Sequence, residues 1–279
     1  MSDAPRSANA TLFPVPKLQM PKLIEFNNVS VEREGNLALR GVTFSIDAGE
    51  HVAILGPNGC GKSTLLKVVT RDCYPRYPMK SSVRIWGEET WTLFDLRATM
   101  GIVTNDLVNL CTQPYSGLET VLSAFFGSIG IWPYHHVTPK MEKRAKELLK
   151  FFDVDHLADR VMTELSSGEA RRIVFARALA HHPKALVLDE PTNSLDVRAQ
   201  HEVRESMQRL VASGVTVIVV THHLPDIIPE IQRVVALKQG KLFFDGKKEE
   251  LLSSEKMQEL FETPVTVRRV GDYYDFGMA

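Results

Sequence analysis

The chain has 279 residues, of which 44% are hydrophobic and 24% are charged, and its formal net charge is −1. This composition is typical of a globular protein with one large or two modest domains, and the balanced charge excludes a global attraction to nucleic acid or to anionic membranes. Its three cysteines, Cys60, Cys73 and Cys111, form no CxxC pair, which favours a reducing cytosol over a disulfide framework. We therefore expect a cytoplasmic protein.

The N-terminal residues 1–21 are rich in proline and small polar residues, and they lack the continuous apolar core of a signal peptide. We expect a disordered lead-in there. The longest apolar runs, such as 215–220 and the patch around 125–132, are too short to span a bilayer. The sequence therefore predicts that the chain does not cross a membrane by itself.

From residue 22 onward, strand-like runs alternate with helical ones, which predicts an α/β fold with a mostly parallel sheet. Two early runs, at 23–31 and 41–46, indicate strands of a further antiparallel layer. Three later runs are rich in Val, Ile and Leu, as expected of strands buried on both faces: 51–55, 185–189 and 215–220.

Between about residues 112 and 180 the character becomes helical. One helical face there is formed by apolar residues at helical spacing, namely Met141, Ala145, Leu148, Leu149 and Phe152. The stretch 240–261 predicts a hairpin followed by a short amphipathic helix. We expect one folded domain over 22–265, with the helical region inserted in it, and a C-terminal tail over 266–279.

The segment GPNGCGKST, residues 56–64, follows the predicted strand 51–55 and precedes a helical run. It fits the phosphate-loop pattern G-x-x-x-x-G-K-[ST], whose glycines let backbone N–H groups curl around an anion. Lys62 would reach the β- and γ-phosphates of a nucleotide, and the Ser63 hydroxyl would bind Mg²⁺. A glycine turn between strand and helix is the structural alternative. The predicted nucleotide-binding residues of the loop are Gly56, Pro57, Asn58, Gly59, Cys60, Gly61, Lys62, Ser63 and Thr64.

Two acids end the buried strand in ALVLDEP, at Asp189 and Glu190. A carboxylate in this position, in a chain with a phosphate loop, predicts a ligand to Mg²⁺ at Asp189. Because side chains alternate along a strand, we expect Glu190 to point to the other side and to orient and deprotonate the attacking water. The alternative is that these acids and the proline merely end the strand.

These motifs, together with LSSGE at 165–169, NSLD at 193–196 and VVTHH at 219–223, resemble those of ATP-binding-cassette (ABC) ATPases. The resemblance covers the chain from 22 to about 262 and depends on the order of the motifs. It implies a P-loop NTPase core with a mixed, mostly parallel sheet, an antiparallel β layer and a helical subdomain at about 112–180. It also implies hydrolysis of ATP with Mg²⁺.

The resemblance assigns further residues. His222, past the strand 215–220, matches the histidine that contacts the γ-phosphate and helps to position Glu190; a surface loop histidine is the alternative. Asp196 lies in the loop that couples two subunits. Ser166 and Gly168 match the signature segment that binds the γ-phosphate of ATP held by the other subunit. This implies a homodimer, or a pair with another ABC subunit, as a head-to-tail nucleotide sandwich.

Read without the resemblance, LSSGEARR predicts a helix start in which Ser166 and Glu169 form an S-x-x-E capping box. Such a start also suits an anion, because its N–H groups and helix dipole attract negative charge.

Four positions depart from the family pattern. Ser167 replaces a signature glycine, and Glu169 replaces the usual glutamine. Asn105 stands where a glutamine normally reaches Mg²⁺ and the water, and it is one methylene shorter. Arg33 stands where an aromatic ring stacks on adenine, a contact that a guanidinium can also make.

The sequence is compatible with two roles for the hydrolysis, beside a third reading without hydrolysis. The first is the energy-coupling subunit of a transporter, docked to a separate membrane permease through the loop 105–116 and the helical insert, with no direct binding of nucleic acid. The second is a stand-alone regulatory or assembly ATPase without a permease. A nucleotide sensor without turnover is disfavoured because Glu190 and His222 are both present. The aromatic residues of the insert fit either a docking surface or a plain core: Tyr115, Phe125, Phe126, Trp132 and Tyr134.

Overall fold

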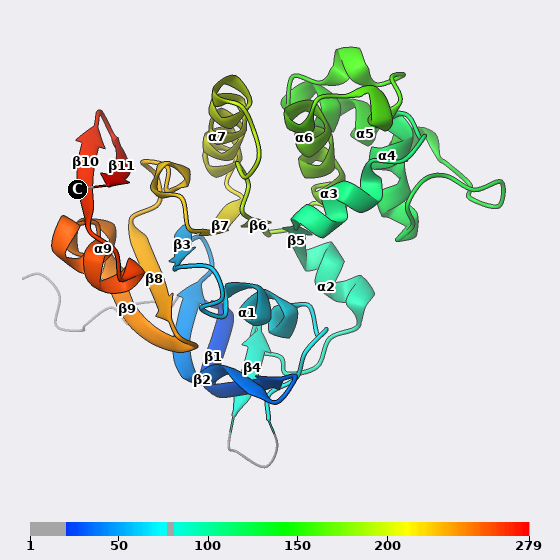
Figure 1. Cartoon of the computed structure of the whole chain (residues 1–279). Helices are drawn as coiled ribbons and strands as arrows, with labels where there is room; N and C mark the ends of the chain where they lie inside the picture. The colour runs from blue at the N-terminus through cyan, green and yellow to red at the C-terminus, as the bar shows by residue number, and fades with distance from the viewer. Residues whose placement is uncertain (1–20, 77–80, 279) are drawn as a thin grey trace, which may run out of the picture.

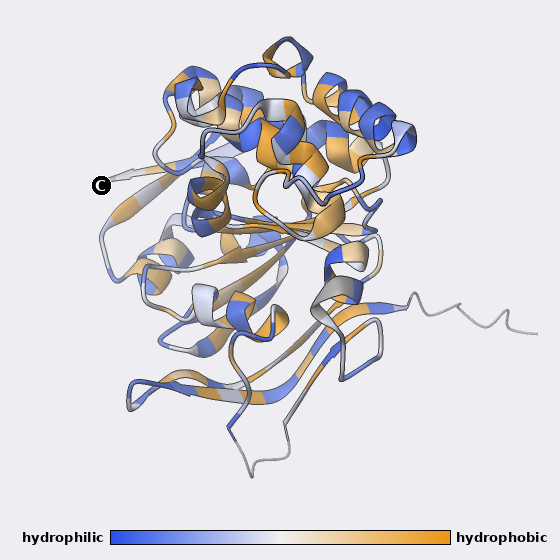
Figure 2. Cartoon of the chain, turned by 90° about the vertical axis from the view of Figure 1, so that its right-hand side faces the viewer, coloured by the Kyte–Doolittle hydropathy of each residue, from blue (hydrophilic) through white to orange (hydrophobic). Residues whose placement is uncertain are grey.

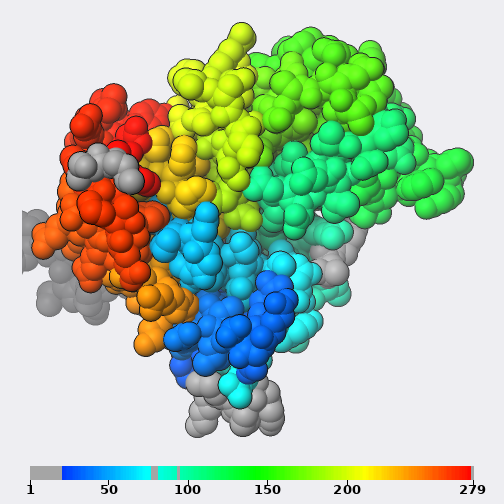
Figure 3. Space-filling view, in the orientation of Figure 1, coloured from blue at the N-terminus to red at the C-terminus, as the bar shows by residue number. Residues whose placement is uncertain are grey.

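The computed structural model describes residues 21–76 and 81–278 (Figure 1). The predicted lead-in over 1–21 lies, apart from its last residue, outside the described residues. Two sheets and a group of helices form the body of the molecule, and a short hairpin lies at the C-terminal end. In the space-filling view the green helical region forms a lobe to one side of the sheets (Figure 3). The mixed sheet, the antiparallel layer and the helical subdomain that the sequence predicted are all present.

The central sheet has six strands in the order β5-β6-β7-β3-β8-β9. The strands from β5 to β8 pair in parallel, and only β9 pairs antiparallel, with β8. The side chains of β3, β5, β6, β7 and the middle of β8 are mostly apolar and buried on both faces, which is visible as the orange strands across the middle of Figure 2, whereas β9 is largely exposed or half-exposed. The strand bounds are β3 Val52–Leu55, β5 Met100–Val103, β6 Ala185–Asp189, β7 Thr216–Thr221, β8 Arg233–Lys238 and β9 Lys241–Lys247.

A three-stranded antiparallel layer covers one side of this sheet in the order β2-β1-β4. It consists of β1 (Lys22–Arg33), β2 (Asn36–Asp47) and β4 (Ser82–Ile85), so the two early strands predicted from the sequence are confirmed. Helix α1 (Lys62–Val69) lies between the layer and the central sheet. Its Leu65 and Val68 belong to the same buried cluster as residues of both sheets.

The helical subdomain packs on the other side, in a larger apolar cluster. Its helices begin at side-chain caps: Thr138 caps α5, where Pro139 takes the first helical position, and Ser116 closes a capping box on α4. On α5, the predicted residues Ala145, Leu148 and Leu149 are buried, as is Phe152 just past its end, whereas Met141 is only partly buried. The bounds are α2 Leu93–Thr99, α3 Asn105–Cys111, α4 Gly117–Ser123, α5 Pro139–Phe151 and α6 Ser167–Ala178, with short 3-10 turns η1 Ala124–Phe126, η2 Asp155–Leu157 and η3 Met162–Glu164.

Beyond this subdomain, α7 (Val197–Ala212) follows β6 and η4 (Leu224–Asp226) follows β7. The amphipathic helix predicted within 240–261 corresponds to α9 (Ser254–Phe261), preceded by the single turn α8 (Lys248–Leu251). The hairpin predicted in the same stretch was misplaced: only β9 lies there, and it pairs with β8, which ends before that stretch begins. The tail 266–279 contains an unpredicted element, because β10 (Val265–Val270) and β11 (Tyr273–Met278) pair antiparallel and pack on the larger apolar cluster. Within the described residues, the helices are all too short or too polar to traverse a bilayer.

Candidate functional site

The sheet order brings three predicted site segments to one edge. In the central sheet β7 lies between β6 and β3, and all three strands run parallel. The phosphate loop follows β3, Glu190 follows β6, and His222 follows β7. Because the carboxyl ends of parallel strands meet at the same edge, these three segments become neighbours.

The phosphate loop is shaped by glycines with left-handed backbone angles and close neighbours. Gly61 caps α1 with φ 112, and a Cβ on it would lie 2.7 Å from the Ala38 carbonyl oxygen. A Cβ on Gly56 would collide with the Leu237 carbonyl oxygen and with the buried Cys60 sulfur. Burial raises the pKa of the Cys60 thiol, so this cysteine is a packing residue rather than a thiolate. The glycines thus allow the loop to pass close to the backbone of two neighbouring strands. They also leave the N–H groups of the loop accessible.

Lys62 lies inside the loop with only 6% of its surface exposed. Its Nζ donates hydrogen bonds to the carbonyl oxygens of Gly56 (2.6 Å) and Pro57 (3.2 Å). The same Nζ lies 3.6 Å from Glu190 Oε1. A phosphate bound here would compete with Glu190 for the ammonium group.

Glu190 is aimed by its own backbone and not by strand alternation. Strand β6 ends at Asp189, and Glu190 takes a left-handed conformation with φ 48. The expected reason for its direction was therefore wrong, because a strand's alternation stops where its extended backbone stops. Its side chain is only 13% exposed, and Oε2 accepts hydrogen bonds from Thr221 Oγ1 (3.3 Å) and from the His222 N–H (3.4 Å).

His222 completes this cluster, whereas His223 is exposed. The Nδ1 atom of His222 lies 2.8 Å from Glu190 Oε2, which pairs the two charges when the ring is protonated, although the ring is not aligned for a hydrogen bond. Lys62, Glu190 and His222 therefore meet around one carboxylate, as the three residues predicted to be catalytic.

The ionised form of the Asp189 carboxylate is disfavoured in the folded chain. Burial first, and then the neighbouring Glu190 carboxylate, raise its pKa to about 6. A divalent cation beside it would offset both effects. In the described part of the chain no cluster of three His, Cys, Asp or Glu residues could hold a metal alone. Mg²⁺ is often bound in proteins through one or two carboxylates together with substrate phosphates. The Ser63 hydroxyl is exposed on the first turn of α1 and is available for the same ion.

Asn105 begins α3 but does not present a free amide oxygen. Its Oδ1 accepts a hydrogen bond of 2.7 Å from Arg171 Nη2. The atom that was expected to reach Mg²⁺ is thus held by a guanidinium. Sequence reasoning missed Arg171, because in LSSGEARR nothing distinguishes it from the adjacent Arg172. Arg33, the expected base-stacking residue, ends β1 and is exposed beside the turn to β2.

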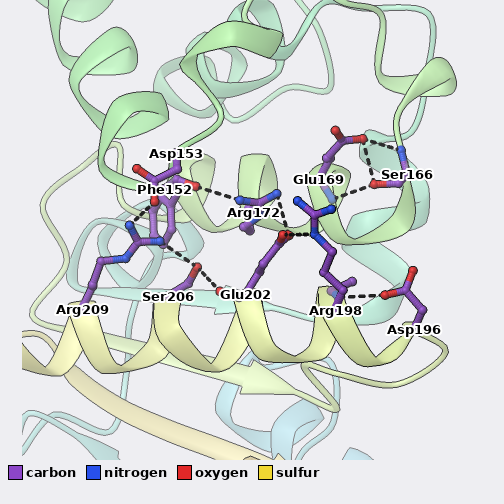
Figure 4. A network of polar contacts seen from close by, with 11 residues as sticks. Phe152, Asp153, Ser166, Glu169, Arg172, Asp196, Arg198, Glu202, Ser206 and Arg209 are labelled. Carbon is purple, nitrogen blue, oxygen red and sulfur yellow. Dashed lines mark hydrogen bonds and ion pairs between the residues drawn. The ribbon is translucent and has the colours of Figure 1, made fainter.

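The signature segment forms the capped start of α6 and lies against α7 (Figure 4). Ser166 Oγ accepts from the Glu169 N–H, and the Glu169 carboxylate accepts from the Ser166 N–H at 2.9 Å, so the predicted capping box is confirmed. Gly168 has a packing reason of its own, since a Cβ there would lie 2.7 Å from the Ala199 Cβ. Asp196 caps α7 by accepting from the Ala199 N–H (2.8 Å).

Ser166 and Asp196 line one groove, of about 590 Å³, between α6 and α7. Ion pairs cross it from Arg172 to Glu202 (3.0 Å) and from Arg209 to Asp153, as the dashed lines in Figure 4 show. Among the described residues that line this groove, none comes from the phosphate loop. This groove therefore contains the signature without the phosphate loop of the same chain, whose residues 57–60 line a different pocket.

Comparison with known proteins gives matches over nearly the whole chain. The family model described as "ABC transporter" matches residues 39–193. The ABC transporter ATP-binding protein YlmA of Bacillus subtilis (strain 168) is 31% identical over 252 residues, 88% of this chain and 93% of the relative. The hemin import ATP-binding protein HmuV of Photobacterium damselae subsp. damselae is 33% identical over 251 residues, covering 88% and 91%. The solved dimeric cassette MJ0796, in a post-hydrolysis state bound to ADP and Pi, is 28% identical with a TM-score of 0.66, covering 80% of this chain and 98% of that one.

Proposed function

The chain belongs to the ABC transporter family as an ATP-binding subunit, and from this premise we propose that it hydrolyses Mg²⁺-ATP with Glu190 as the base, at a site completed by a second subunit. The observation that carries the proposal is the meeting of Lys62, Glu190 and His222 at the ends of three adjacent parallel strands. One carboxylate there contacts both an ammonium and an imidazole, which is how a general base is held beside a phosphate site.

Each role in the proposed hydrolysis is assigned to particular residues of this chain. The loop 56–64 surrounds the phosphates, and Lys62 leaves Glu190 to pair with the γ-phosphate. Glu190 then orients and deprotonates the attacking water, while His222 holds the carboxylate from the other side. Asp189 and Ser63 would hold Mg²⁺, which when bound neutralises charge on the phosphates. Asn105 Oδ1 already accepts a hydrogen bond from Arg171, which leaves one lone pair of this oxygen for the ion.

The second subunit is proposed because the signature lies apart from the phosphate loop of the same chain. The start of α6 is the positive end of a helix dipole and suits an anion, and among the described residues that line its groove none belongs to the phosphate loop of the same chain. Ser166 is exposed there and lines the groove shared with Asp196. Two copies related by a two-fold axis would each bring this helix start to the other's γ-phosphate. The dimeric form of the similar cassette MJ0796 supports this arrangement.

The permease is proposed to be a separate protein, and the cassette to lie on the cytoplasmic face of the membrane. Family membership and the hemin import relative favour this role over that of a stand-alone ATPase. The aromatic residues of the insert fall into two groups, one in the core and one at the surface. Phe125 packs against the core, whereas Trp132 and Tyr134 are 45% and 72% exposed. With the exposed Leu110 of α3, these two rings form the proposed docking surface. Hemin is the cargo named for that relative, and it is not assigned to this chain.

The experiment is the Glu190→Gln variant, which keeps the side chain's shape and removes the base. We expect ATP binding to persist, hydrolysis to fall by at least about 100-fold, and an ATP-bound dimer to accumulate, measured by phosphate release and by light scattering. The exposed Glu255→Gln variant on α9 serves as the matched control and should hydrolyse ATP normally. Unchanged turnover in Glu190→Gln would refute the assignment of the base.

A further inference from the structure

Arg171 is a buried cation at the centre of the site, with 7% of its surface exposed. It lies on α6, five residues after the Ser166 cap, so its side chain and the signature share the first turns of one helix. Burying a guanidinium is costly unless its donors are satisfied, so such a residue is retained where its hydrogen bonds matter. Its partners therefore indicate what it does.

The guanidinium joins two segments that are far apart in the sequence. Nη1 donates to the carbonyl oxygens of Glu190 (2.9 Å) and Pro191 (2.6 Å), and Nη2 donates to Asn105 Oδ1 (2.7 Å). Among the described residues, the three acceptors of this guanidinium are uncharged groups, namely two backbone carbonyl oxygens and one side-chain amide oxygen. Only the planar fork of arginine presents two nitrogens at a fixed spacing to such separated acceptors, whereas a lysine ammonium is a single point.

The contact with Glu190 falls on a strained residue. Glu190 is in the left-handed region with φ 48, a conformation that is strained for a non-glycine residue and persists only when its surroundings enforce it. Its carbonyl oxygen accepts from Arg171 on one side and from the Asn193 N–H (3.1 Å) on the other. The direction of the Glu190 carboxylate, toward Lys62 and His222, follows from this backbone conformation.

We propose that Arg171 is a positioning residue for hydrolysis: its guanidinium, carried on the signature helix, fixes the left-handed turn at Glu190 and the amide of Asn105 in one geometry. This inference rests on the proposed function, because positioning has meaning only if Glu190 is the base. It also gives α6 two contacts, with Ser166 facing the partner's ATP and Arg171 holding the base of its own chain.

The test compares Arg171→Met and Arg171→Lys with a matched control, Arg177→Met. Arg177 lies on the same helix, is partly buried and donates to Ser123 Oγ (3.3 Å) and to the Ser128 carbonyl oxygen (2.9 Å), away from the site. We expect kcat to fall roughly 10- to 100-fold in Arg171→Met and less in Arg171→Lys, since a displacement of about 1 Å of a reacting group costs that much. The KM and Kd for ATP should stay within about threefold, because the phosphate loop is untouched.

A purely structural role would lower the melting temperature of Arg171→Met and Arg177→Met alike and leave kcat per folded molecule unchanged in both. Equal kcat in these two variants, measured well below their melting temperatures, would overturn the inference. In addition, Arg171→Met should still form the ATP-bound dimer, so that hydrolysis and dimer formation separate.

A second comparison decides the matter if Arg171→Met does not fold. Asn105→Leu keeps the side-chain volume but removes the acceptor, and we expect the loss of kcat in Asn105→Leu/Arg171→Lys to be smaller than the product of the two single losses. Strict multiplication of those losses would contradict the coupling. The two proposals fail separately: active Glu190→Gln refutes the proposed function, whereas inactive Glu190→Gln with fully active Arg171 variants refutes only the positioning role.

Discussion

The raised pKa of Asp189 predicts that this carboxylate destabilises the protein without its ligand. Replacing it by asparagine keeps the volume and removes the charge that burial and Glu190 oppose. The change from its ordinary value of 3.8 to about 6 in the folded chain corresponds to up to about 3 kcal/mol. We therefore expect Asp189→Asn to be more stable than the wild type at neutral pH, although Asp189 is a site residue.

The sign follows from the protons bound by each state. Below the unfolded value of 3.8 both states are protonated, and the wild type loses nothing. Between 3.8 and about 6 the unfolded chain releases the proton first, so the stability of the wild type falls as pH rises. Above about 6 the deficit is constant. The advantage of Asp189→Asn should be about 1 kcal/mol near pH 4.5 and approach about 3 kcal/mol near pH 7.5.

Urea unfolding followed by circular dichroism at several pH values measures this difference, with Asp155→Asn as a control for the same substitution at an exposed position. Saturating Mg²⁺-ATP should reverse the order at neutral pH, because it stabilises the chain that retains the carboxylate. A difference that does not vary with pH, or an asparagine variant less stable than the wild type near pH 7.5, would refute the reasoning.

Two further predictions concern neighbouring residues. Gly168→Ala should lower the free energy of unfolding by about 1–3 kcal/mol because its Cβ meets Ala199, and Ala199→Gly in the same chain should restore most of it; urea unfolding that shows no rescue would place the strain elsewhere. His222→Gln should slow ATP hydrolysis at least about 10-fold while ATP binding measured by calorimetry changes little, and wild-type turnover would remove His222 from the mechanism.

The sequence could predict the features that depend on local pattern. Apolar runs identified the strands that end at Leu55, Asp189 and Thr221, and adjacency of those parallel strands explains why Lys62 and Glu190 meet. The capping box at Ser166 was predictable because its two partners are three residues apart.

What the sequence could not predict depends on tertiary contacts. The left-handed turn at Glu190 is enforced by Arg171 and Asn193, and an arginine gives no sign in its sequence of the carbonyl oxygens it will meet. Gly168 was interpreted only through its expected ligand, whereas its fit against Ala199 arises from the crossing of α6 and α7. The hairpin β10–β11 escaped notice because its short strands are half-exposed and charged, and they are held by packing on the core.

The shared site can be tested most directly by mixing two inactive variants. Lys62→Ala disables the phosphate loop, and Ser166→Arg blocks the exposed start of α6 without touching that loop. In a one-to-one mixture about half of the dimers combine both variants, and each has one intact site, so single-turnover hydrolysis should recover to about a quarter of the wild-type amplitude. A mixture no more active than its parents, or a fully active Ser166→Arg protein, would contradict a site built from two subunits.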